Sequence, residues 1–177
     1  LELEDEYTED RFEPNEFVNR IRKRVAAWRE AGYPKVTPTT RKLLQYWTKS
    51  DREKTKRFFF CQLEALETAI YIAEVAESQG DAWLLEDLAK ENADANPDLF
   101  RIAFRMATGS GKTVVMAMLI AWQGLNKIKR PQDTRFSDAF LVVSPGITIR
   151  DRLQVLKPNV EGNYYRERDI VPADLLE

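Results

Sequence analysis

The sequence predicts an α/β protein, in which a helical N-terminal region precedes the opening β-α-β-α units of a parallel sheet. Three observations lead to this prediction. Apolar residues recur at helical spacing through the first half of the chain. Two short apolar runs in the second half have the length and composition of strands. Each run leads through a glycine-containing turn into another helical pattern, an alternation that is typical of a parallel sheet covered by helices.

Four helices are expected in the first half, each with one apolar face. The Gly-Tyr-Pro sequence at 32–34 ends the first helix, and Thr37-Pro38 begins the second. The other two helices are expected over about residues 60–78 and 81–92. The Asn-Pro sequence at 96–97 then gives the signal for a turn.

The second half contains the two expected strands. Residues 99–106 alternate between apolar side chains and arginine or alanine, which predicts a strand. Residues 139–144 form an unbroken apolar run, which predicts a strand covered on both faces. Helices are expected over about residues 111–126 and 147–156. Because a sheet of two strands is not a finished domain, we expect this sheet to be incomplete.

Charge is segregated along the chain, although the net charge is only −2. Residues 1–16 carry eight acidic side chains and one basic one, so they form an acidic N-terminal segment. Residues 17–57 carry a net charge of +10, and residues 61–100 carry −9. The basic stretch is either a nucleic-acid surface or the solvated face of amphipathic helices, and the second interpretation is the more common one.

Composition excludes several classes of site. The single cysteine excludes an internal disulfide, and the absence of histidine excludes histidine bases and histidine-cysteine zinc sites. No apolar run is long enough for a membrane span, so no membrane partner is expected. We expect a cytoplasmic location. The chain begins with Leu1 instead of methionine, so we expect it to be part of a longer protein.

The sequence Thr-Gly-Ser-Gly-Lys-Thr at 108–113 predicts a phosphate-binding loop. Gly109 and Gly111 allow backbone angles that turn successive N–H groups toward one anion. The helix that follows adds the positive end of its dipole. Lys112 can reach the β- and γ-phosphates, and the Thr113 hydroxyl can be a magnesium ligand. ATP and Mg²⁺ are therefore the expected cofactors.

Three segments together resemble a known family. Met106 replaces the first glycine of the usual phosphate-loop formula, and the sequence MATGSGKT resembles motif I of the superfamily 2 helicases and translocases. RFFFCQLEAL at 57–66 resembles the glutamine motif of that superfamily. FLVVSPGITIRDRLQVL at 140–156 resembles motif Ia. The similarity is greatest to the Res, or motor, subunit of type III restriction enzymes and related DEAD/DEAH-like ATPases.

The resemblance implies a fold and a set of site residues. Residues 98–177 would be the first part of a RecA-like P-loop domain, truncated before its Walker B strand, and 17–97 would be a helical region that carries the glutamine motif. Gln62 would read the adenine edge, and Lys112 would be the catalytic lysine. Ser144, Pro145 and Gly146 would face a nucleic-acid phosphate. The phosphate cradle would consist of Met106, Ala107, Thr108, Gly109, Ser110, Gly111, Lys112 and Thr113.

Three functions remain open at this point. The first is the ATP-binding N-terminal part of a DNA-dependent ATPase from a restriction-type system, with duplex DNA and a modification or specificity subunit as partners. After Thr113 no strand candidate leads into an Asp-Glu pair, so we expect no hydrolysis by this chain alone. The second is part of a DEAD-box-like RNA helicase, and the third is a non-catalytic module that senses nucleotide or binds a partner protein.

Overall fold

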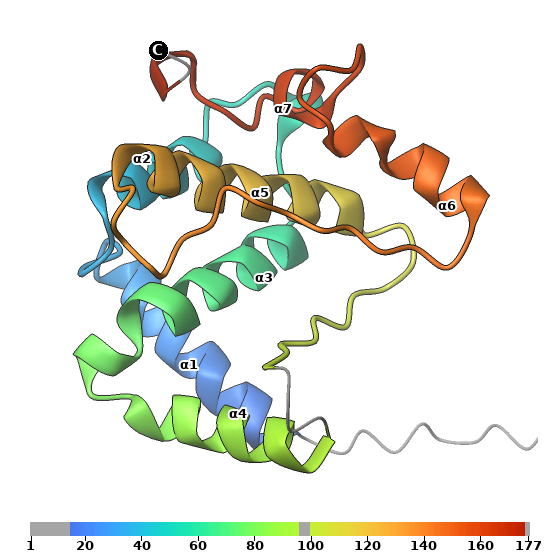
Figure 1. Cartoon of the computed structure of the whole chain (residues 1–177). Coiled ribbons are helices and arrows are strands. Elements are labelled where there is room, and N and C mark those ends of the chain that lie inside the picture. Colours follow the sequence, from blue (N-terminus) through green and yellow to red (C-terminus); the bar gives the residue numbers. More distant parts are fainter. Residues whose placement is uncertain (1–14, 96–99, 176–177) are drawn as a thin grey trace, which may run out of the picture.

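The computed structural model describes residues 15–95 and 100–175 (Figure 1). The α-helices are α1 (Glu16–Glu30), α2 (Pro38–Trp47), α3 (Phe60–Ile70), α4 (Ala82–Ala95), α5 (Lys112–Lys129), α6 (Ile147–Arg152) and α7 (Tyr164–Glu167). A π-helical turn, η2 (Tyr71–Val75), continues α3. Four short 3-10 helices complete the description: η1 (Lys54–Lys56), η3 (Glu77–Gln79), η4 (Leu153–Leu156) and η5 (Ala173–Leu175).

The predicted helices are confirmed where their end signals are strongest. The side chain of Asn15 caps α1 by accepting a hydrogen bond from the backbone N–H of Val18 at 3.0 Å. Thr37 caps α2 in the same way, accepting from the N–H of Thr40, and Pro38 occupies the first turn. The third helix is shorter than predicted, because at Tyr71 the backbone widens into η2.

The predicted α/β class, with its incomplete parallel sheet and RecA-like start, is wrong for this structure. No residue within 15–95 or 100–175 belongs to a strand. The two expected strands, as far as they lie in the described residues, run as extended chain without pairing with each other (Figure 1).

Each segment contacts a helix, but most of its apolar side chains are exposed, so the expectation that residues 139–144 are covered on both faces is wrong. The amide of Asn92 in α4 bonds both the N–H and the carbonyl of Arg101. In the second segment Leu141 and Val143 are 90% and 83% exposed, whereas the ring of Phe140 lies on α5 at Gly124. The alternation at 99–106 and the unbroken apolar run at 139–144 therefore did not lead to strands in the described residues. Strand formation needs a partner strand, and neither pattern can supply one by itself.

The core lies where α5 packs on α2 and α3, close to the middle of Figure 1. Its fully buried side chains include Leu43 and Leu44 from α2, Leu66 from α3, and Ala117 and Met118 from α5. The small Ala117 allows the helices to approach closely, and burial of the larger side chains provides the main stabilisation. Within the described part of the chain, every helix is too short or too polar to cross a bilayer.

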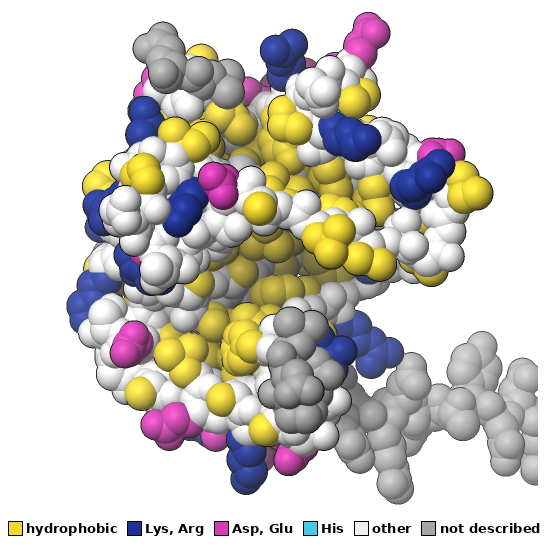
Figure 2. All heavy atoms as spheres, in the orientation of Figure 1, with side chains coloured by type: hydrophobic (Ala, Val, Ile, Leu, Met, Phe, Trp, Pro, Cys, Tyr) yellow, Lys and Arg dark blue, Asp and Glu magenta, His cyan; other side chains and the backbone are white. Residues whose placement is uncertain are grey.

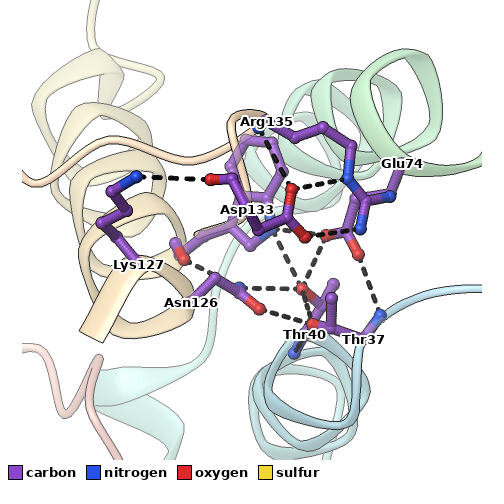
Figure 3. Close-up of polar contacts among 8 residues, drawn as sticks. Thr37, Thr40, Glu74, Asn126, Lys127, Asp133 and Arg135 are labelled. Atoms are coloured by element: carbon purple, nitrogen blue, oxygen red, sulfur yellow. Dashed lines mark hydrogen bonds and ion pairs between the residues drawn. The ribbon is translucent and has the colours of Figure 1, made fainter. Parts of the chain in front are cut away.

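A buried polar cluster links α2, η2 and α5 (Figure 3). The carboxylate of Glu74 in η2 accepts hydrogen bonds from the Thr37 N–H at 2.9 Å, the Thr40 hydroxyl at 2.6 Å and the Trp122 indole at 2.7 Å. The amide of Asn126, further along α5, donates to the Thr40 hydroxyl at 2.9 Å. Every member of this cluster is therefore satisfied, and α5 is held at a fixed position relative to the first half of the chain.

Candidate nucleotide-binding site

The loop that precedes α5 has the backbone geometry of an anion-binding turn. Gly109 and Gly111 have φ angles of +80° and +81°, in the left-handed region that residues with side chains seldom enter. Gly111 is followed at once by the first residue of α5, Lys112. Left-handed residues alternating with right-handed ones turn consecutive N–H groups to the same side of the chain.

Several N–H groups of this loop are available to a ligand. Within the described residues, no acceptor takes the N–H of Gly109, Gly111, Lys112 or Thr113. The loop carbonyl of Ala107 is in contrast used three times, by the Ser110 N–H, the Ser110 hydroxyl and the Lys112 ammonium. The Lys112 Nζ lies 2.8 Å from that carbonyl oxygen, so the lysine folds back over the loop. An anion bound by the amides would meet this ammonium.

Gln62, predicted from a distant part of the sequence, lies directly against the loop. It sits in the first turn of α3 and is only 4% exposed. Its Nε2 donates to the carbonyl oxygen of Ser110 at 2.9 Å, and its Oε1 accepts from the N–H of Phe59 at 2.9 Å. The structure therefore unites Gln62 with the phosphate loop, and its predicted contact with adenine stays a prediction.

A cavity of about 940 Å³ opens beside the loop, between α1, α3, α4 and the extended segment before the loop. Met106, Ala107 and Ser110 contribute to its wall, and its charged lining is mixed, with Glu64 and Glu91 beside the arginines at 22, 101 and 105. Figure 2 shows hydrophobic side chains gathered in the hollow of this face of the molecule. The space next to the loop is therefore largely apolar, and the loop amides are the donors that an anionic group would meet.

Two aromatic side chains beside Gln62 have no role in the sequence prediction. Phe59 and Phe60 are 59% and 67% exposed, which is unusual for side chains of this size. The run of three phenylalanines at 58–60 is the signal in the sequence, because a single helix start can seldom bury all three. Exposed rings at this position offer a flat surface on which a nucleobase can stack.

The third predicted segment lies apart from this site. Ser144 lines a groove of about 710 Å³ between α5 and the 138–158 region, and Gly146 precedes α6. The Ser144 hydroxyl donates to the carbonyl of Gly146 at 3.4 Å. No hydrogen bond within the described residues joins Ser144, Pro145 or Gly146 to Gln62 or to the phosphate loop.

Magnesium has one predicted protein ligand here. Among the residues that the structure describes, no three acidic or cysteine side chains gather closely enough to hold a metal ion. The hydroxyl of Thr113, at the half-buried second position of α5, has no hydrogen-bond partner in the described part of the chain. An ion at Thr113 would therefore need to take most of its oxygen ligands from a bound nucleotide and water.

Comparison with known proteins agrees with this geometry. The family model described as "Type III restriction enzyme, res subunit" matches residues 55–171, which include Gln62, the phosphate loop and the segment at 144–146. No curated protein and no solved structure matches the chain. Because the matched range covers more than half of the sequence, the chain belongs to the helicase-like ATPase family of the type III restriction enzyme res subunit.

Proposed function

We propose that this chain binds magnesium-ATP at residues 106–113 and serves as the ATP-binding part of a DNA-dependent helicase or translocase of a restriction-type system. The observation that carries the proposal is the row of free N–H groups at Gly109, Gly111, Lys112 and Thr113, held at the start of a long helix. Donors of this kind bind phosphate oxygens without the need for a folded lid.

Lys112 and Thr113 have separate roles in this proposal. The exposed Lys112 ammonium needs only to leave the carbonyl of Ala107 to neutralise the terminal phosphates. Thr113 offers its hydroxyl to the magnesium ion, which supplies charge neutralisation at the phosphate oxygens. We further propose that Gln62, which contacts the same loop through the Ser110 carbonyl, reads the adenine edge, and that the exposed rings of Phe59 and Phe60 stack on the base.

Hydrolysis is not expected from these residues alone. The sequence after Thr113 contains no two adjacent acidic residues, and this class of ATPase uses such a pair to hold magnesium and to orient the attacking water.

Duplex DNA and a modification subunit are the proposed partners, with Ser144, Pro145 and Gly146 as the proposed contact to a DNA phosphate.

The test is a calorimetric titration of magnesium-ATP into the chain and into its Lys112→Ala variant. Loss of a charge-assisted phosphate contact should cost about 1.5–3 kcal/mol, which is about ten- to a hundredfold in affinity. Lys129→Ala, which removes a lysine from the opposite end of α5, is the matched control and should bind like the parent chain. Equal affinities of the Lys112→Ala variant and the parent, or no binding by the parent, would contradict the proposal.

A further inference from the structure

We infer that Gln62 is a positioning residue for the phosphate loop, and that it supports binding of the phosphates whatever base they carry. This inference rests on the proposed function, because it assigns a role to Gln62 within the same site. It differs from the adenine contact predicted by sequence resemblance, since it places the effect of Gln62 on the loop backbone.

The side chain of Gln62 is held at both ends of its amide. Oε1 accepts the N–H of Phe59 and so fixes the amide to the start of α3, at 2.9 Å. Nε2 then points to the loop and donates to the carbonyl of Ser110, also at 2.9 Å. With 4% of the residue exposed, water competes poorly for either bond.

The bond to the Ser110 carbonyl also sets the direction of an N–H group. In a trans peptide the carbonyl and the N–H of the next residue point to opposite sides. Every peptide bond of the described chain is trans, so anchoring the Ser110 carbonyl toward α3 turns the Gly111 N–H away from α3. That N–H is one of the free donors proposed for the phosphates.

Gln62 also approaches Gly111 closely. A Cβ atom placed on Gly111 would overlap the Gln62 Nε2, so a residue with a side chain at this position would push the amide away from the loop. Glycine is therefore favoured here by its φ of +81°, and its replacement would in addition disturb the Gln62 contact.

The experiment compares two ligands that share phosphates and differ in the base. Magnesium-ATP and magnesium tripolyphosphate are titrated into the full chain and into its Gln62→Ala and Gln62→Glu variants. Gln62→Glu keeps the acceptor for the Phe59 N–H but has no donor for the Ser110 carbonyl, and its negative charge also repels the phosphates. We expect Gln62→Ala to lose about five- to tenfold in affinity for both ligands, as for one lost hydrogen bond, and Gln62→Glu to lose more for both.

Hydrogen exchange of the loop amides gives a second readout, which needs no ligand. Exchange over residues 107–114 should be faster in both variants, while exchange over α2 stays unchanged and shows that the fold is intact. Gln154→Ala, a glutamine on η4, is the control and should change neither measurement.

The possible outcomes separate the two proposals. A loss of affinity for ATP with unchanged affinity for tripolyphosphate would overturn the inference and assign Gln62 to the base alone. Unchanged exchange of the loop in both variants would overturn it as well. If the unmodified chain binds neither ligand, the proposed function itself fails.

Discussion

At the scale of single residues, buried carboxylates connect helices that are distant in the sequence. Glu67 on α3 is 1% exposed and accepts hydrogen bonds from the guanidinium of Arg29 on α1 and, at 2.6 Å, from the hydroxyl of Tyr33. Burial and the hydrogen bond to Glu67 together raise the pKa of Tyr33 well above its ordinary value. A buried carboxylate of this kind is compatible with a stable fold only while its partners remain, because an unpaired buried charge raises the free energy of the folded state.

Replacement of Glu67 by glutamine should therefore lower the free energy of unfolding. The amide keeps the shape of the side chain, but it removes the charge that Arg29 faces and places an NH₂ group where an acceptor is needed. We expect a loss of about 2–3 kcal/mol, measured by urea unfolding.

Glu64→Gln is the control for this change, since Glu64 pairs with the more exposed Arg22 at 3.3 Å. The Glu64→Gln change should lower the free energy of unfolding by less than about 1 kcal/mol, as for other surface ion pairs. Equal losses for the two variants would show that burial of Glu67 has no energetic consequence.

At the scale of elements, the connection that leaves α5 is held by a local ion pair. Arg135 donates to both carboxylate oxygens of Asp133, at 3.0 and 2.7 Å, and Lys127 on α5 donates to the Asp133 carbonyl (Figure 3). The hydrogen bond from Arg135 is the main cause that lowers the pKa of Asp133 to about 2. After this turn the chain runs from the end of α5 back along the same helix (Figure 1).

Acid should remove the stabilisation by Asp133. Because the pKa in the folded state lies below the ordinary value of 3.8, its contribution is complete above about pH 4 and is lost as the pH falls toward about 2. Unfolding followed by circular dichroism from pH 5 to pH 2 should show a smaller acid-dependent loss of stability for Asp133→Asn than for the parent chain.

Asp138→Asn provides the comparison, because Asp138 belongs to the same connection and forms no ion pair among the described residues. It should unfold with the same acid dependence as the parent chain. An identical acid dependence of the Asp133→Asn variant would mean that the ion pair does not act on stability.

At the scale of the whole molecule, the segregated charges of the sequence meet in space. Basic side chains of α1 pair with acidic side chains of the stretch 61–100: Arg22 with Glu64, and Arg24 with Asp81. Arg52, which is buried, donates to backbone carbonyls, among them that of Asp169 at 2.8 Å. Much of the positive charge of residues 17–57 therefore serves the fold, which agrees with the interpretation of this stretch as helix surface.

This pairing leads to a prediction about duplex DNA. Replacing Arg152 on α6, which forms no ion pair among the described residues, by alanine should reduce the slope of log affinity against log salt by about 0.9, the contribution of one phosphate contact. Replacing both Arg22 and Arg24 should leave that slope unchanged, because carboxylates already neutralise them. Fluorescence anisotropy of a labelled duplex over a range of salt concentrations measures the slope for each variant. A smaller slope for the α1 variant, with an unchanged slope for the α6 variant, would place DNA on α1.

Local signals in the sequence were sufficient for the starts of α1 and α2 and for the glycine conformations of the loop before α5. Capping by Asn15 and Thr37 and the glycines at 109 and 111 act through neighbouring backbone, so the residues alone determine them. The resemblance of the motifs also identified the family correctly. In contrast, the widened turn at 71–75 has no local signal, since it is stabilised by Thr37, Thr40 and Trp122 around Glu74.

The sequence by itself thus determined the helix starts, the left-handed glycines before α5 and the family of this protein. Tertiary structure alone decided that the two extended segments do not pair as strands and that Gln62 reaches the Ser110 carbonyl across 48 positions of chain. The physical reason is the range of the interactions. Helix caps and left-handed glycines depend on bonds within a few residues. Strand pairing and the contact of Gln62 depend on which surfaces meet.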